Sequence, residues 1–233
     1  MNTSPSAAES AAEPAAQPTA PSAPSARTQV KRSANRASHD PVVLHAIIDA
    51  AWICHVAFRD DHGVHCIPTA CWRIGEHLYI HGSNGSRMVK RLLDDECCVT
   101  ITHVDGLVMA RSAFNHSMNY RSAVIYGRFE KVDESGEVDK RDALEAFMEH
   151  LAPGRQAEIR PGNDNEYAAT TVLRIALAEA ACKVRSGPPE DDPEDMDVRA
   201  WAGVLPLREV RGAPVPDAAC TIAAPCYVRH WQE

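Results

Sequence analysis

The 233-residue sequence lacks the features of a membrane-spanning or secreted protein. No segment approaches the roughly eighteen consecutive apolar residues that a membrane helix needs, and the N-terminal segment has no apolar core of a signal peptide. No C-x-x-C motif occurs, and the eight cysteines lie mostly inside apolar runs, as reduced and buried thiols do. We therefore expect a cytoplasmic protein with no membrane partner. A transit peptide is the alternative, which two N-terminal glutamates disfavour.

The common nucleotide and metal motifs are also missing. Gly82-x-x-Gly85 has no third glycine of the dinucleotide fingerprint, and G-x-x-x-x-G-K-[ST] occurs nowhere. Three histidines lie near Cys66, but strand alternation would distribute them over both faces of a strand and over a turn. They are His55, His62 and His65. We therefore expect no metal site.

Positive charge is scarce over most of the chain. The net charge is −8, yet residues 1–38 hold four basic and two acidic side chains, which leaves −10 on the remainder. A body this acidic repels nucleic acid and anionic membranes, and it can hold a phosphate only at a local basic cluster. We therefore expect a small-molecule partner and no nucleic acid.

Large apolar side chains are almost absent from residues 1–38, which are rich in Ala, Pro and Ser. Such a segment cannot bury enough surface to offset the entropy of ordering, so we expect a disordered tail. The whole chain is 45% hydrophobic and 24% charged, which suits a globular protein with a real core. Residues 39–233 are therefore predicted to form one domain.

The sequence does contain a strand that leads through a glycine-bearing turn into a basic helix, at residues 78–91, LYIHGSNGSRMVKR. Gly82 and Gly85 permit a tight turn, and the apolar spacing after them becomes helical. Backbone N–H groups and the positive end of the helix dipole meet at such a junction and bind anions. Hydroxyl and basic side chains add donors there: Ser83, Ser86, Arg87, Lys90 and Arg91. The pattern favours a phosphate site, with an ordinary link and a solvated basic face as the alternative.

The remaining pattern predicts an α+β, mainly β domain. Asp40-Pro41 begins a helix as N-cap and first-turn proline, Asp105-Gly106 marks a short hairpin, and a second helix begins at Ser135. Strands are predicted over residues 52–58, 64–74, 78–81, 97–104, 107–113, 120–132 and 170–184, with a helix over 176–182 as an alternative. Six or more antiparallel strands with inserted helices suggest a barrel.

Several motifs follow one another in an order that resembles a known family. They are I-P-T at 67–69, L-Y-I-H-G-S at 78–83, G-S-R at 85–87, D-G-L-V-M-A-R-S-A-F at 105–114, H-S-M-N-Y-R-S at 116–122 and W-A-G-V-L-P-L at 201–207. Together they resemble the flavin-nucleotide-binding branch of the pyridoxamine 5′-phosphate oxidase superfamily, which includes nitroimidazole-reductase-type proteins. The resemblance covers roughly residues 38–210 and is far more specific than any single motif.

The resemblance implies an FMN-binding split β-barrel with inserted helices. It further implies a homodimer that holds FMN in two equivalent clefts at the subunit interface. The implied activity is an FMN-dependent oxidoreductase that transfers electrons from a reduced nicotinamide, NADH or NADPH, to a small organic acceptor. A non-catalytic flavin- or haem-binding carrier or sensor of the same barrel is the alternative, and haem would need an exposed His or Cys as axial ligand.

The resemblance also assigns residues to the flavin site. Ser86 and Arg87 match the serine and basic residue at the flavin phosphate, and His81 matches the strand position beside the ring. Met88 stands where relatives often have lysine, so Lys90 or Arg91 would supply the second charge. Two further segments match strands that line or enter the cleft, namely Pro68 and Thr69 in one and Asn119, Tyr120, Arg121 and Ser122 in the other.

A positive side chain near the N1–C2=O edge of a flavin would stabilise its anionic reduced form. The basic candidates for this position are Arg111, Arg121, Lys183 and Arg185. An ordinary salt-bridge network with the acidic residues near 190–195 is the alternative for the arginines. Tyr120 and Trp201 are aromatic candidates for the cofactor cleft, and packing in the core or an interface is their alternative role.

Overall fold

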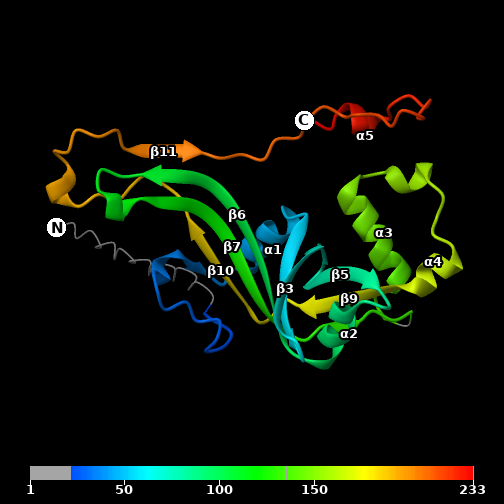
Figure 1. The fold of residues 1–233 in the computed structure, drawn as a ribbon. Coiled ribbons are helices and arrows are strands. Elements are labelled where there is room, and N and C mark those ends of the chain that lie inside the picture. Colours follow the sequence, from blue (N-terminus) through cyan, green and yellow to red (C-terminus); the bar gives the residue numbers. More distant parts are fainter. Residues whose placement is uncertain (1–21, 135, 233) are drawn as a thin grey trace, which may run out of the picture.

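The computed structural model describes residues 22–134 and 136–232 (Figure 1). Most of the predicted tail, residues 1–21, and the predicted helix cap Ser135 lie outside these described residues. Within the described part, no helix is both long enough and apolar enough to cross a membrane.

Two antiparallel sheets make up the fold. The larger sheet has the strand order β1 (Ala37–Ser38), β10 (Ala180–Arg185), β7 (Ser117–Gly127), β6 (Cys97–Met109), β2 (Ile53–Asp60) and β3 (Gly63–Ala70), and β11 (Gly203–Pro206) pairs with the far part of β6. The smaller sheet has the order β4 (Trp72–Ile74), β5 (His77–Ser83), β9 (Thr170–Ala176) and β8 (Glu130–Lys131). The prediction of a mainly antiparallel α+β fold is therefore confirmed.

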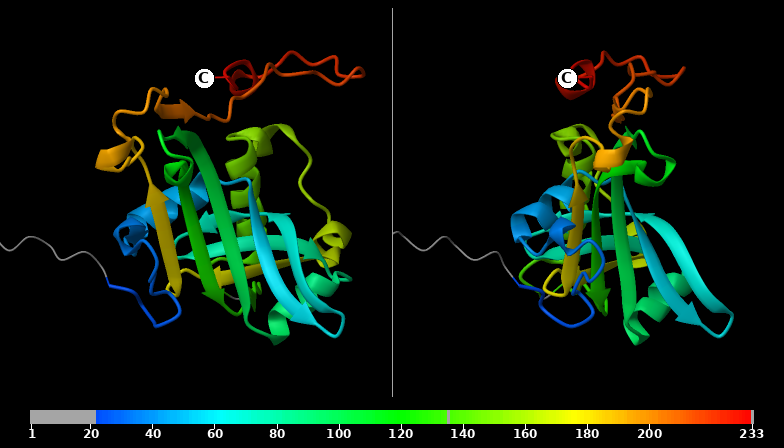
Figure 2. Two further views of the ribbon diagram at one scale, coloured as in Figure 1. Left: turned by 60° about the vertical axis from the view of Figure 1, so that its left-hand side comes forward. Right: turned by 90° about the vertical axis from the view of Figure 1, so that its left-hand side faces the viewer.

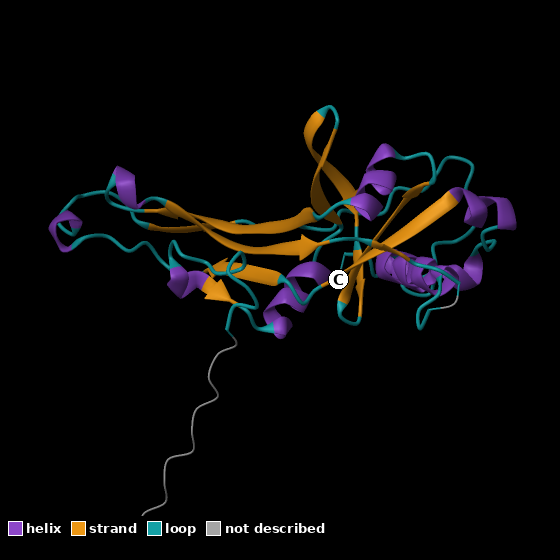
Figure 3. Cartoon of the chain, turned by 90° about the horizontal axis from the view of Figure 1, so that it is seen from below, coloured by secondary structure: helices purple, strands orange, loops and turns teal. Residues whose placement is uncertain are grey.

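The described residues form the α-helices α1 (Pro41–Asp49), α2 (Arg87–Asp94), α3 (Lys140–Leu151), α4 (Asp164–Ala169) and α5 (Cys226–Arg229). They also form the short 3-10 helices η1 (Ala34–Arg36), η2 (Ala113–Asn115), η3 (Arg155–Glu158) and η4 (Pro193–Asp195). Figure 1 and Figure 3 show the long strands β6 and β7 reaching one end of the molecule, where the short helices η2 and η4 lie, and the helices α3 and α4 at the other end. The described chain thus has a strand-rich end and a helical end.

The core lies where the two sheets face each other. Alternate residues of the central strands, such as Val56, Val99 and Ile125, are fully buried there together with Ile80 and Leu173 of the smaller sheet. A second apolar cluster, centred on Trp72 and Tyr79, fills the space between the smaller sheet and α3. The sheets remain open at their edges and together form the split β-barrel that the resemblance implies.

The predicted hairpin at Asp105-Gly106 is wrong. Strand β6 runs through these residues without reversing, and only its register with β7 shifts between Val104 and Gly106, as at a β-bulge. A Cβ atom on Gly106 would meet the Leu205 carbonyl oxygen and the Val204 side chain, each at 3.0 Å. The glycine therefore permits the close approach of β11 and does not form a turn.

Two predicted strands divide between the sheets. The stretch 170–184 becomes β9 in the smaller sheet and β10 at the edge of the larger one, and 64–74 becomes β3 and β4. The alternative helix over 176–182 does not form. Apolar residues continue through both halves of each stretch, so the residue pattern alone could not reveal the change of sheet.

Residues 22–38 of the predicted tail contact the rest of the chain in the described structure. Thr28 is 1% exposed, and the Arg27 guanidinium lies 2.9 Å from Glu96 and 3.3 Å from Glu179. Strand β1 then pairs with β10, with Ala37 opposite Lys183. Polar and backbone contacts anchor this segment, which a criterion based on apolar content does not detect.

Candidate functional site

The loop of residues 83–87, between β5 and α2, forms the predicted strand-turn-helix junction. Ser86 is the N-cap of α2, and its hydroxyl accepts a hydrogen bond from the Val89 N–H at 3.4 Å. The first-turn N–H groups of Arg87 and Met88 have no acceptor within the helix. They point from the positive end of the α2 dipole, so the junction has the donors of an anion site.

Neighbouring elements hold this loop in place. Asn84 accepts a hydrogen bond from the Thr171 hydroxyl at 2.6 Å, and its own backbone N–H donates to the Ala169 carbonyl oxygen at 3.1 Å. Gly82 lies so close to α2 that a Cβ atom there would meet Val89 Cγ2 at 2.8 Å. These contacts fix the loop on β9 and α2, so its donors are preorganised.

Arg87 is oriented by a buried carboxylate that the sequence did not reveal as a site residue. Arg87 Nε lies 3.2 Å from Asp60 Oδ2, and the Asp60 side chain is 5% exposed whereas that of Arg87 is 54% exposed. Within the described residues, the two terminal nitrogens of Arg87 make no hydrogen bond. They are free to donate to a ligand while Asp60 holds the stem of the guanidinium.

Asp60 is kept ionised by its surroundings. Burial would raise the pKa of its carboxyl, but the His62 N–H, the His65 ring and Arg87 together lower that pKa below the ordinary value. The Asp60 Oδ1 atom lies 2.8 Å from both the His62 nitrogen and His65 Nε2. A negative Asp60 can therefore orient Arg87 at neutral pH.

The other predicted residues of this junction lie close by. Ser83 is exposed, and its hydroxyl accepts from the Gly85 N–H at 3.3 Å. Lys90 is exposed one helical turn after Ser86. The structure therefore brings Ser83, Ser86, Arg87 and Lys90 to one end of α2, as predicted.

His81 lies on the same strand but faces α3. Its ring centroid is 5.0 Å from that of Phe147 and 5.8 Å from that of Trp72. Burial lowers the pKa of His81, and its Nδ1 atom has no hydrogen-bond partner among the described residues. His81 is thus a neutral imidazole between aromatic rings, on the opposite side of β5 from the core residue Ile80.

The strand β3 carries Pro68 and Thr69. Pro68 lies opposite His55 and Thr69 opposite Cys54 of β2, so the two residues point to opposite faces of the larger sheet. Pro68 is exposed on the outer face and Thr69 is partly buried on the inner one. The two predicted residues therefore belong to different sides of one strand.

A second group of predicted residues lies at the strand-rich end. Arg185 of β10 is 6% exposed, and its guanidinium donates to Asn119 Oδ1 of β7 and to the Pro188 carbonyl oxygen at 3.1 Å. Only neutral oxygen atoms contact it among the described residues, and its Nε atom has no partner. Arg185 is therefore a buried cation without a carboxylate partner, contrary to the alternative of an acidic network.

The neighbouring basic residues are already engaged. Arg121 makes two hydrogen bonds of 2.9 Å with Asp105, which lower the pKa of that carboxyl. Arg111 lies 2.8 Å from Asp191, an acidic partner in the predicted region. Lys183 donates to the Arg32 carbonyl oxygen at 3.0 Å, and Ser122 donates to the Lys183 carbonyl oxygen at 3.2 Å. The positive charges of Arg121, Arg111 and Lys183 are therefore less available to a ligand than that of Arg185.

The aromatic candidates lie near this second group. Tyr120 is directly opposite Arg185 in the β7–β10 register and is partly buried. Trp201 is 65% exposed and lies over Gly203, where a Cβ atom would meet the indole ring at 3.0 Å. Phe114 and Met118 are exposed as well, at 94% and 50%. This end of the larger sheet therefore presents aromatic and apolar surface.

One chain does not bring the two groups together. Pro68 aligns through His55 and Thr100 with Val124, and Tyr120 lies four residues further along β7. Three strand spacings and four residue rises place Pro68 and Tyr120 about 20 Å apart. The residues predicted for one cleft therefore form two separate groups within a single chain.

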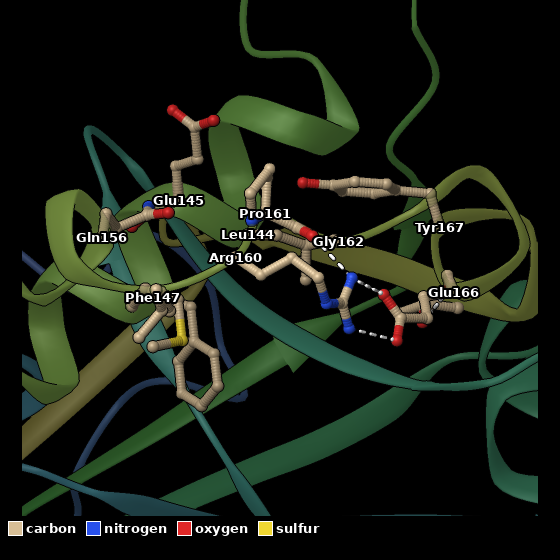
Figure 4. A pocket seen from close by; sticks show the side chains of 12 residues that line it. Leu144, Glu145, Phe147, Gln156, Arg160, Pro161, Gly162, Glu166 and Tyr167 are labelled. Carbon is tan, nitrogen blue, oxygen red and sulfur yellow. Dashed lines mark hydrogen bonds and ion pairs between the residues drawn. The ribbon is translucent and has the colours of Figure 1, made fainter.

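A hollow of about 220 Å³ lies between α3 and the segment that leads into α4 (Figure 4). Leu144, Phe147 and Met148 contribute apolar surface to it. Arg160 donates two hydrogen bonds, 2.8 and 2.9 Å long, to Glu166, which help to lower the pKa of Glu166 to about 2. The hollow contains none of the predicted cofactor residues and is distinct from the anion site.

Comparisons with known proteins agree with this architecture. The flavocytochrome Anf3 from Azotobacter vinelandii is 40% identical with a TM-score of 0.85, over 90% of this chain and 98% of that one. The FAD and heme binding protein from Mycobacterium smegmatis is 35% identical with a TM-score of 0.78, over 84% and 97%. A 5-nitroimidazole antibiotic resistance protein from Bacteroides thetaiotaomicron VPI-5482, 21% identical with a TM-score of 0.53 over 64% and 86%, shares the fold.

A search of curated proteins finds no match. The family model described as pyridoxamine 5′-phosphate oxidase matches residues 40–184, which include the smaller sheet, the strands β2, β3, β6 and β7 of the larger sheet and the β5–α2 junction. The chain therefore belongs to the pyridoxamine 5′-phosphate oxidase family and has its flavin-binding fold.

Proposed function

We propose that this protein is a homodimeric redox protein that binds a flavin nucleotide and a haem. The observation that carries the proposal is the β5–α2 junction, where fixed backbone donors and a half-exposed arginine form an anion site in a flavin-binding fold. The relatives that are 40% and 35% identical are named as a flavocytochrome and as a binder of FAD and heme. These names support haem as a second cofactor.

The junction suits the phosphate next to the ribityl chain of a flavin. Arg87 offers its terminal nitrogens, Ser86 and the first turn of α2 offer hydroxyl and N–H donors, and Lys90 adds charge from one turn away. A phosphate can leave water at acceptable cost when donors of this kind surround it. FMN and FAD both carry this phosphate. Because the more similar relatives include an FAD binder, we propose FAD, and FMN is the alternative.

Two copies of the chain would complete the site. In the left view of Figure 2, strands β7, β6 and β2 face the viewer with no described helix across them. Outward residues on this face, such as His55, Thr100 and Val124, are partly or fully exposed. A second copy packed on this face would approach Pro68 of one chain with residues of the other chain's β7. The site is therefore proposed to lie between subunits.

A flavin supplies the redox chemistry when it is bound, and the protein residues position and polarise it. The buried cation Arg185 is proposed to stabilise negative charge at the N1–C2=O edge in the reduced state. A reduced nicotinamide is the proposed electron donor and a small organic molecule the proposed acceptor, in the cytoplasm. A carrier or sensor without turnover is the alternative function.

An absorbance spectrum of the purified protein tests this proposal. We expect the visible absorbance bands of an oxidised flavin together with the Soret band of a haem. The flavin bands should bleach when NADH or NADPH is added in the absence of oxygen. Chromatography of the released cofactor separates FAD from FMN, and light scattering measures the mass in solution. A monomer that retains flavin would refute the shared site. A flavin that no reduced nicotinamide bleaches would favour the carrier.

A further inference from the structure

A histidine that ligates a haem iron needs a fixed ring and a lone pair on the nitrogen that faces the iron, usually Nε2. In protein metal sites the Nδ1–H of such a histidine usually donates to a backbone carbonyl or a carboxylate, which leaves Nε2 for the metal. All eleven histidines of the sequence lie in the described residues. Their hydrogen bonds therefore allow a comparison of every candidate.

Two histidines meet this requirement. His116 Nδ1 lies 2.9 Å from the Ser112 carbonyl oxygen, and His230 Nδ1 lies 2.8 Å from the Cys226 carbonyl oxygen. A carbonyl oxygen can only accept, so the proton is on Nδ1 in both rings. Nε2 of each ring has no hydrogen-bond partner among the described residues and keeps its lone pair.

In the other histidines with hydrogen-bonded rings, the hydrogen bond occupies Nε2, the nitrogen that a haem iron would need. His103 and His150 donate through Nε2 to the carbonyl oxygens of Ile47 and Ala51, at 2.9 and 3.3 Å. His65 Nε2 is engaged by Asp60 at 2.8 Å and His45 Nε2 by Glu76 at 3.2 Å. In each case the nitrogen that normally binds a haem iron is already occupied.

His230 borders a hollow of about 280 Å³ whose walls are largely aromatic. Trp52, Tyr227 and Trp231 line it together with Leu151 and Pro153. Flat aromatic and apolar walls suit a macrocycle, and this volume at the lower end of ligand sites would hold part of one. The His116 loop is different, because its neighbour Phe114 is 94% exposed and provides no enclosing wall.

A cation also lines the hollow. The Arg211 guanidinium carbon lies 4.6 Å from the Trp231 ring centroid, a cation–π contact, and no carboxylate of the described residues pairs with Arg211. An arginine at the wall of an aromatic slot can pair with a carboxylate of a ligand. Haem has two such groups, its propionates.

The hollow is held together by polar contacts between distant segments. The Tyr227 hydroxyl donates to Glu158 Oε2 at 2.9 Å and accepts from Arg155 Nη1 at 2.9 Å. These bonds tie α5 to η3. The ring centroid of His150, near the end of α3, lies 5.1 Å from that of Trp52, with the two rings tilted by 50°. The site is therefore built from α5, the end of α3 and the segment before β2.

We propose that His230 is the axial ligand of the haem and that the hollow beside it, lined by Trp52, Trp231 and Arg211, holds the macrocycle edge. This proposal rests on haem binding in the proposed function. Arg211 pairs with a propionate. His150 keeps its Nε2 on the Ala51 carbonyl oxygen, so it does not compete as a ligand.

The experiment compares His230→Ala with the matched control His116→Ala, because both rings bond a carbonyl four residues earlier. Each full-length protein is stripped of haem, titrated with hemin and followed by its Soret band, with flavin content as the check on folding. We expect His230→Ala to lose affinity at least about tenfold, on the scale of lost support at a metal site. His116→Ala should bind as the wild type does. His230→Gly should regain the wild-type spectrum on addition of imidazole.

The outcomes separate the inference from the proposed function. If the wild-type protein takes up no hemin, haem binding itself is refuted, and the inference with it. If the wild type binds but His230→Ala binds equally, with an unchanged Soret band, the assignment of His230 is refuted while the haem proposal stands. A selective loss in His116→Ala or in His150→Ala would move the ligand to that residue and overturn the assignment. Arg211→Ala should weaken binding without changing the Soret position.

Discussion

Replacement of Arg87 by alanine tests the anion site at the start of α2. Asp60 engages Arg87 Nε at 3.2 Å, and the terminal nitrogens are left for a ligand. Hydrogen bonds to charged groups contribute about 1.5–3 kcal/mol, and the 54% exposure of the Arg87 side chain argues against a larger value. We therefore expect flavin nucleotide affinity to fall by about 2 kcal/mol, which is roughly thirtyfold.

The assay is fluorescence titration of the flavin-free protein with FMN, FAD and riboflavin. Riboflavin lacks the phosphate, so its weaker binding should hardly respond to Arg87→Ala. Lys90→Ala is the matched control from the next turn of α2, and its effect should be smaller and should fade with added salt because the side chain is exposed. The melting temperature of each variant shows whether the fold is intact, which matters most for Arg87→Ala because that substitution removes one partner of Asp60.

Two results would refute this reasoning. Equal losses for FMN, FAD and riboflavin would mean that Arg87→Ala damages the fold and removes no phosphate contact. Unchanged affinity for FMN and FAD in a folded variant would mean that the phosphate binds elsewhere. The assignment of the β5–α2 junction would then be wrong.

Four further predictions concern stability and potential. Gly82→Ala would place a Cβ atom 2.8 Å from Val89 Cγ2 and should cost about 1–3 kcal/mol in urea unfolding, more than Gly85→Ala, whose nearest atom is 3.8 Å away. Deletion of residues 1–38 removes the β1–β10 pairing and should lower the melting temperature by several degrees. The pKa of Asp60 is lower in the folded protein than in the unfolded chain, where it is near 3.9, so ionised Asp60 stabilises the fold above that pH. This stabilisation is lost as the pH falls from about 4 through the folded pKa. The free energy of unfolding should therefore fall less steeply with decreasing pH in Asp60→Asn than in the wild type. Arg185→Gln should lower the reduction potential of bound flavin, whereas Arg121→Gln, already paired with Asp105, should change it less.

Local chemistry could be predicted from the sequence because a few adjacent residues determine it. Asp40 caps α1 and accepts from the Val42 N–H at 2.8 Å, and Ser86 caps α2. Gly63 adopts a φ of 119° at the predicted turn after β2. Caps and turns depend on side chains within three or four positions, so one sequence contains the necessary information.

The change of sheet between β9 and β10 could not be predicted. Apolar residues continue on both sides, and what separates the two strands is their pairing with β5 and with β7, about 90 and 60 residues away in the sequence. The prediction of a hairpin at Asp105-Gly106 was wrong for a related reason. The glycine serves a contact with β11, and no local rule distinguishes that role from a hairpin.

The candidate site shows the same division. Ser86 and Arg87 can be predicted because they adjoin a helix start, whereas no sequence pattern marks Asp60 as a site residue. Its role follows from the β2–β3 hairpin, which places the carboxylate beside a helix 27 residues later in the sequence. Likewise, Arg185 and Arg121 have similar sequence contexts, and only the structure shows that one has a carboxylate partner and the other has none.

Arg185 is a buried cation that has no anionic partner within the described part of the single chain. A guanidinium that is 6% exposed loses most of its hydration, and neutral oxygen atoms of Asn119 and Pro188 replace only part of it. A protein gains little stability from such a residue unless an anion approaches it, because hydrophobic side chains would pack as well. Arg87 of the anion site contacts Asp60, which lies beyond His55 in the direction away from Tyr120, so within one chain the anion site is farther from Arg185 than the about 20 Å between Pro68 and Tyr120. A single bound nucleotide can therefore satisfy both groups most simply when they come from two subunits. The unpaired charge is therefore an argument, independent of the relatives, for a negatively charged ligand shared between two copies of the chain.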